Sequence, residues 1–144
     1  MTKCLLAGQQ LAIASSSNQD DYLQFNLRLY DVRIGSQHRT HEHRLLPFAP
    51  TPNNQPVLDT IISSSFSPDG LFLALGREDN MTHVYDARYF DDPLYVLRHE
   101  TGHGRKYGIT HHDWYTPAGQ FQVPLLLTAG DDGEPSKLHP FKQY

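Results

Sequence analysis

The pattern H-E-x-x-H of zinc peptidases occurs once in this sequence, at His99-Glu100-Thr101-Gly102-His103. In that chemistry two imidazoles on one helix face bind the metal, and the glutamate activates the metal-bound water. A helix is unfavourable here, because Gly102 lies inside the motif and Tyr95-Val96-Leu97 upstream favour a strand. We therefore expect no catalysis and no metal at this motif, and keep a zinc metallopeptidase as an alternative that needs a helix over residues 99–103.

The other residues with possible chemistry lack the composition of a site. His38, His41 and His43 lie beside Arg39 and Arg44 and have no cysteine or fixed carboxylate pair, so a solvated outer strand is expected there. His111 and His112 would point to opposite faces of a regular strand and could not ligate together. The serine runs at 15–17 and 63–65 have no glycine-flanked nucleophile elbow. The sequence thus predicts a protein that is not an enzyme and has no cofactor.

The composition argues against a nucleic-acid-binding, membrane or secreted protein. The 144 residues carry a net charge of −4, which gives no broad basic surface for nucleic acid. No apolar run approaches the roughly 18 residues of a membrane helix, and residues 4–7 are too short for a signal peptide. A single cysteine, Cys4, fits a reducing compartment. We expect an intracellular protein, cytoplasmic or nuclear, in which the sequon at Asn80 carries no glycan.

The elements that position these residues are strands arranged in repeats. Turn glycines at Gly8, Gly70 and Gly119 each precede an apolar run, and the pairs Tyr30-Asp31 and Tyr85-Asp86 lie 55 residues apart. Such periods indicate repeats that bury their faces against one another. The predicted units cover residues 1–46, 57–98 and 108–144, with a proline-rich loop at 47–56.

Strand signals fill each unit, and no long amphipathic helix is evident. The middle unit predicts four antiparallel strands, at 61–66, 71–76, 81–86 and 93–98, with Ser67-Pro68-Asp69-Gly70 as the first turn. In the first unit, 11–14 and 26–31 are predicted strands joined by a polar connection at 15–21. The third unit predicts strands at 109–114, 125–130 and 136–139, the last ended by Pro140. The predicted fold class is all-β.

The sequence resembles the WD40 repeat family at particular motifs. These are Phe66-Ser67-Pro68-Asp69-Gly70, Gly102-His103 ahead of a strand ending in Trp114, the turn aspartates, and the Tyr-Asp endings. The resemblance implies an incomplete β-propeller of about three four-stranded antiparallel blades, a piece of a larger propeller. It implies mainly structural roles for Gly8, Tyr30, Asp31, Ser67, Pro68, Asp69, Gly70, Tyr85, Asp86, His103, Trp114 and Asp131 or Asp132.

The chain also departs from the family pattern. Tyrosine replaces the signature tryptophan in both endings, and Leu138-His139-Pro140 stands where a third ending belongs. Only seven residues precede Gly8, so the first unit is expected to begin inside a blade. Three blades cannot close a ring. We therefore expect the exposed blade edges to associate with further blades or with another copy.

The expected function is a protein-interaction scaffold. The segment from Leu73 to Arg88, with Asp79 at its seventh position, resembles the box of WD40 substrate receptors that dock on the cullin-4 RING ubiquitin ligase adaptor. In that family the terminal arginine helps dock the receptor. Arg33 ends the first unit similarly after a longer hairpin, whereas Asp86 and Arg88 could instead pair within the blade. The predicted partner-binding residues are Arg33, Asp79, Arg88, Tyr89, Phe90, Asp91 and Asp92.

Overall fold

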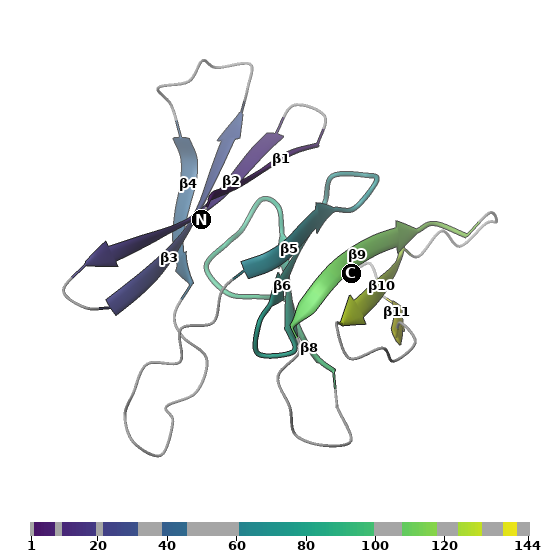
Figure 1. The fold of residues 1–144 in the computed structure, drawn as a ribbon. Coiled ribbons are helices and arrows are strands. Elements are labelled where there is room, and N and C mark those ends of the chain that lie inside the picture. Colours follow the sequence, from purple (N-terminus) through teal and green to yellow (C-terminus); the bar gives the residue numbers. More distant parts are fainter. Residues whose placement is uncertain are drawn as a thin grey trace. The chain divides into compact units, whose positions relative to one another are not determined.

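A computed structural model describes residues 2–7, 10–19, 22–31, 39–45, 61–99, 108–117, 124–130 and 137–140. This part of the chain is all-β, with antiparallel strands in three sheets. It contains no helix, and hence none long and apolar enough to cross a membrane. The chain divides into two compact units, Met1–Thr60 and Ile61–Tyr144, which are described separately (Figure 1).

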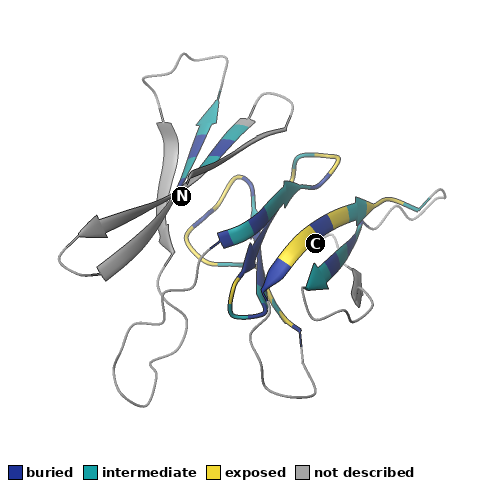
Figure 2. Cartoon of the chain, in the orientation of Figure 1, coloured by how far each residue is buried: buried dark blue, intermediate teal, exposed yellow. Residues whose placement is uncertain are grey.

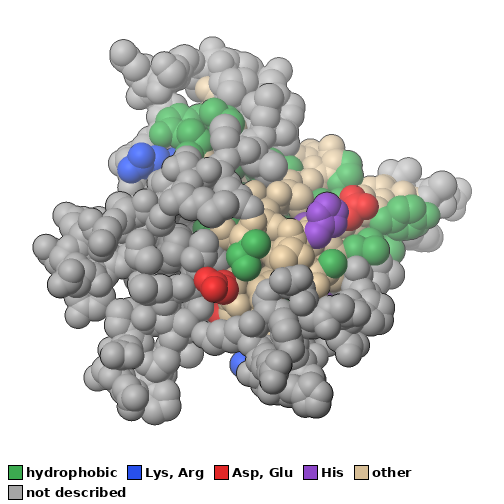
Figure 3. Space-filling model, in the orientation of Figure 1, with side chains coloured by type: hydrophobic (Ala, Val, Ile, Leu, Met, Phe, Trp, Pro, Cys, Tyr) green, Lys and Arg blue, Asp and Glu red, His purple; other side chains and the backbone are tan. Residues whose placement is uncertain are grey.

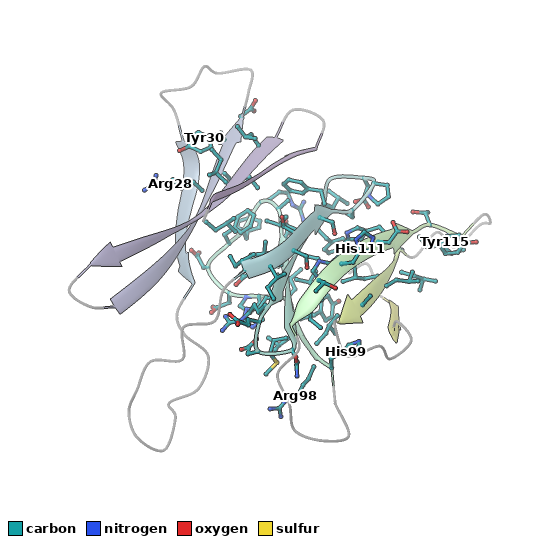
Figure 4. The ribbon with its side chains drawn as sticks, in the orientation of Figure 1. Arg28, Tyr30, Arg98, His99, His111 and Tyr115 are labelled. Atoms are coloured by element: carbon teal, nitrogen blue, oxygen red, sulfur yellow. The ribbon has the colours of Figure 1, made fainter. Side chains whose placement is uncertain are left out.

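The first unit contains one four-stranded sheet, in the order β1-β2-β3-β4. The strands are β1 (Thr2–Ala7), β2 (Gln10–Gln19), β3 (Tyr22–Asp31) and β4 (Arg39–Leu45). Leu27 and Leu29 of β3 are buried, whereas Arg28 and Tyr30 between them are half-buried (Figures 2 and 4). This alternation is what a strand with one covered face requires.

One expectation for the first unit is wrong. The polar connection predicted at 15–21 is mostly strand, because β2 and β3 pair from Ser15↔Asn26 through Gln19↔Tyr22. Strand pairing uses backbone groups, so a run of serines does not prevent it. Strand β1 pairs with β2 from Thr2↔Ser15 through Ala7↔Gln10.

The sheet at the start of the second unit has the order β5-β6-β7-β8. The strands β5 (Ile61–Phe66), β6 (Phe72–Arg77), β7 (Met81–Asp86) and β8 (Tyr95–Arg98) lie within a residue or two of the predicted ranges. The turn between β5 and β6 forms as its sequence predicts, which explains why the predicted and observed strands agree. Gly70 has φ 72°, its N–H donates to the Ser67 carbonyl, and an Asp69 carboxylate oxygen accepts the Leu71 N–H.

The third sheet has the order β11-β10-β9, with β9 (Ile109–Tyr115), β10 (Leu125–Gly130) and β11 (Lys137–Pro140). Three strands are seen among the described residues, where a four-stranded sheet was expected. The predicted strands at 109–114 and 125–130 are confirmed, whereas the last strand was expected to stop before Pro140 and instead includes it.

The core of the second unit lies between its two sheets. Strand β9 lies against β5 and β6 (Figure 1). Phe72, Ala74 and Val84 of one sheet form a buried cluster with Leu126 of the other. Three half-buried side chains, Tyr95, Leu97 and Trp114, pack around this cluster. Apolar burial between the two sheets therefore makes the second unit one packed body.

Candidate functional site

Several exposed apolar and charged side chains of the second unit lie at one end of the β5–β8 sheet. Successive hairpins turn at alternate ends, so the β5–β6 turn and the β7–β8 connection share an end. The Ala87 N–H joins them by donating to the Leu71 carbonyl at 2.8 Å. Both connections carry exposed residues (Figure 2). We call these exposed residues together the end surface. They are Pro68, Asp69, Leu71, Arg88, Tyr89, Asp91, Asp92 and Leu94.

Two buried aromatic side chains anchor the β7–β8 connection to the sheet. Phe90 is only 1% exposed and its ring stacks on that of Tyr85, with the centroids 5.6 Å apart. Tyr85 is itself buried at the end of β7, and this burial raises the pKa of its phenol. The Tyr89 N–H donates to the Asp86 carbonyl. Tyr89 therefore stands 68% exposed on a fixed backbone.

Arg88 forms a fork-shaped ion pair with Asp86. Its Nε lies 2.9 Å from Asp86 Oδ1 and its Nη2 lies 2.7 Å from Oδ2, while the Arg88 backbone N–H also donates to Oδ1. The pairing of Asp86 with Arg88 that the sequence left open is thus present. The Arg88 side chain nevertheless remains 64% exposed. Its hydrogen bonds lower the pKa of the Asp86 carboxyl.

This pair predicts a change in titration. The folded protein favours the carboxylate form of Asp86. The pair therefore stabilises the fold at pH values above the ordinary aspartate pKa of about 3.9. This stabilisation is lost as the pH falls through the lowered pKa of Asp86 in the folded protein. In Arg88→Ala we expect the Asp86 pKa to rise toward its ordinary value. NMR titration of the Asp86 carboxyl carbon in the variant and in the unaltered chain measures it. An unchanged Asp86 pKa in the variant would contradict the assignment.

Asp79, predicted to contact a partner, lies instead in the turn at the other end of the sheet. Its carboxylate pairs with Arg77, with Oδ1 3.2 Å from Nε and Oδ2 3.1 Å from Nη2. Both side chains are less than a tenth exposed. Of the predicted contact residues, Arg88, Tyr89, Asp91 and Asp92 are exposed, whereas Asp79 and Phe90 are covered. Arg33 lies outside the described residues, as do the signature residues Gly8, His103 and Asp131.

Asn80 ties together the two ends of the segment that follows β8. Its carbonyl accepts the His99 N–H, and its side-chain Oδ1 accepts the Gly108 N–H, each at 2.9 Å. The residue has φ 66° and is 8% exposed. The side-chain oxygen of Asn80 is therefore engaged within the chain. His99 is not helical, and the remaining residues of the H-E-x-x-H motif lie outside the described part.

Two substitutions of Asn80 test the importance of its side-chain oxygen. Asn80→Ala should lower the free energy of unfolding by roughly 2 kcal/mol, because alanine disfavours positive φ and leaves the Gly108 N–H unsatisfied. Asn80→Asp keeps both the tolerance of positive φ and an acceptor oxygen, so it should lose much less. Urea unfolding of both variants measures this. Equal losses in the two variants would contradict the role of the side-chain oxygen.

A buried histidine joins the two sheets of the second unit. Ser63 Oγ donates to the Ile109 carbonyl, so the ring of His112 must donate from Nδ1 to Ser63 Oγ, at 3.1 Å. Nε2 then accepts from Thr82 Oγ1, also at 3.1 Å. The expectation that His111 and His112 face opposite sides is confirmed, because His111 is exposed (Figure 4) and His112 is buried. Sequence reasoning missed the partners of His112, which come from the other sheet.

Trp114 makes a second link between these sheets. Its indole N–H donates to Ser65 Oγ at 2.9 Å, and its ring stacks on Phe72 with centroids 6.2 Å apart. Trp114 therefore contributes to the packing of the two sheets. Within the ranges that the structure describes, no group of three or more histidine, cysteine or acidic side chains could hold a metal ion.

No protein-family model and no curated protein matches this sequence. The described residues define an all-β protein of antiparallel sheets, and its second unit carries acidic and hydrophobic side chains next to one another on its surface (Figure 3).

Proposed function

We propose that this chain is a non-catalytic platform of the WD40 type that binds other proteins, with blade-like units at 1–46, 57–98 and 108–144. Three features support the proposal. Each sheet follows a simple meander, the β5–β8 and β9–β11 sheets pack face to face, and the Ser67–Gly70 turn connects β5 and β6. We place this platform inside the cell, in the cytoplasm or the nucleus.

The observation that carries the proposal is the exposure of Tyr89 on a fixed connection. Interface hot spots are enriched in tyrosine and arginine, and a residue held in place loses little further entropy on binding. Tyr89 and Arg88 adjoin one another, and the buried Phe90 holds the segment beneath them. Leu71 and Leu94 add exposed apolar surface at the same end. This combination suits contact with a protein.

A matched pair of tyrosines tests the proposal. Tyr89→Ala should remove partners that the full chain captures in affinity purification with mass spectrometry. Tyr115→Ala is the control, because Tyr115 is also exposed, at 55%, but lies on β9 of the other sheet. Circular dichroism would establish that both variants fold. The proposal fails if both variants retain the same partners as the unaltered chain.

A second candidate function is that of a substrate receptor on the cullin-4 RING ubiquitin ligase. The observation that favours it is the exposed Arg88 side chain at the end of the Leu73–Arg88 segment. Under this proposal Arg88→Ala weakens capture of the ligase's adaptor, while Arg28→Ala, on β3 of the first unit, leaves it unchanged. Equal adaptor capture by the two variants would remove this candidate.

A further inference from the structure

The charge of the end surface indicates what kind of partner it fits. Counting Asp86 at its margin, the two connections carry four carboxylates and a single guanidinium, that of Arg88. The carboxylates belong to Asp69, Asp86, Asp91 and Asp92. The formal charge at this end is therefore clearly negative. Such a surface raises the local concentration of cationic groups and repels anionic ones.

The geometry of Arg88 strengthens this bias. Asp86 engages both Nε and Nη2 of the guanidinium, so the edge of Arg88 that would grip a partner's carboxylate is already used within the chain. By contrast, Asp69 accepts hydrogen bonds from the Ser67 hydroxyl and the Leu71 N–H, which are neutral donors and leave its negative charge uncancelled. The single positive group is thus neutralised locally while acidic groups outnumber it.

The same two connections also carry exposed apolar side chains. Leu71 is 38% exposed and Leu94 is 51% exposed, and Tyr89 presents most of its ring to solvent. An aromatic face attracts a cation through its quadrupole, and Leu71 and Leu94 offer surface for aliphatic side chains. A long basic side chain has both properties, because its aliphatic stem can pack on such surface while its charged head stays near carboxylates.

We propose that the end surface binds a basic segment of a partner protein in which lysine or arginine is interspersed with apolar residues. This inference rests on the proposed function and adds that the bound segment of the partner is positively charged. Cationic heads of the segment lie by Asp69 and Asp92, an aliphatic stem lies across Tyr89, and apolar side chains cover Leu71 and Leu94. An acidic segment meets like charge at the same surface.

Two short synthetic peptides that differ only in charge test this polarity. Both alternate charged residues with leucine; one carries lysine and the other glutamate. Fluorescence anisotropy with the full chain should show binding of the lysine peptide alone, weakened as salt rises from about 0.05 to about 0.3 M. Asp69→Asn/Asp92→Asn should weaken it about tenfold. Glu78→Gln, an exposed acid in the turn at the opposite end, should leave it unchanged.

The outcomes separate this inference from the proposed function. Preference for the glutamate peptide, binding of neither peptide, or equal binding by the double asparagine variant and the unaltered chain would overturn the basic-partner inference. If Tyr89→Ala still removed captured partners in that event, the platform would stand with a partner of different chemistry. If Tyr89→Ala removed none, the platform itself would fall.

Discussion

Replacing Asp79 with alanine is expected to lower the free energy of unfolding by about 3–5 kcal/mol, because it leaves the buried Arg77 guanidinium without the carboxylate that pairs with it. The carboxylate also accepts the Met81 N–H at the start of β7, so the substitution removes a turn contact as well. Urea unfolding followed by circular dichroism measures the change.

Neighbouring substitutions make this prediction specific. Glu78→Ala, at an exposed position in the same turn, should change stability by no more than about 0.5 kcal/mol. Adding Arg77→Met to Asp79→Ala should recover part of the loss, because an apolar side chain does not need the pairing that a buried cation needs. A loss in Asp79→Ala no larger than that in Glu78→Ala would show that the Arg77–Asp79 pair is not a buried support of the turn.

The second large effect is expected from Gly76→Ala, at roughly 3 kcal/mol of lost stability. A Cβ at this position would lie 2.3 Å from Ser63 Oγ, 2.6 Å from His112 Cε1 and 2.7 Å from the Ile109 carbonyl oxygen. The methyl group would therefore press directly on the contact between the two sheets. Urea unfolding followed by Trp114 fluorescence reports on this contact, because the indole bridges the same sheets.

Further variants distinguish crowding from other causes. Ser63→Ala combined with Gly76→Ala should relieve only part of the loss, because the Ile109 carbonyl is backbone and stays in place. Gly70→Ala meets nothing within 4 Å but forces alanine to a φ of 72°, so it should cost only about 1–2 kcal/mol. Near-native stability of Gly76→Ala would contradict the close approach of the sheets.

The middle unit was predictable from its sequence because local signals agree there. Apolar residues alternate or cluster over strand-length runs, and Pro68, Asp69 and Gly70 each suit the turn geometry that forms. In the first unit the serines and the asparagine at 15–18 suggested a loop. Their backbone groups pair as a strand all the same, which composition does not reveal.

The candidate site was predictable only in part. The exposure of Arg88, Tyr89 and Asp91 follows from their place just after a strand, where a connection begins. The burial of Asp79 depends on Arg77 two residues earlier, a pairing that the sequence permits but does not require. The contacts of His112 join strands whose residues are far apart in the chain, so they depend on how the sheets pack and leave no local signal.

Hydrogen–deuterium exchange of the full chain, alone and bound to a partner that depends on Tyr89, tests the central claim most directly. The end surface predicts slower exchange on binding in peptides covering residues 67–71 and 86–94, with β9 and β10 unchanged. Slowing confined to residues 109–117 or to the first unit, with 86–94 exchanging as in the unbound chain, would contradict the assignment of the end surface as the place where partners bind.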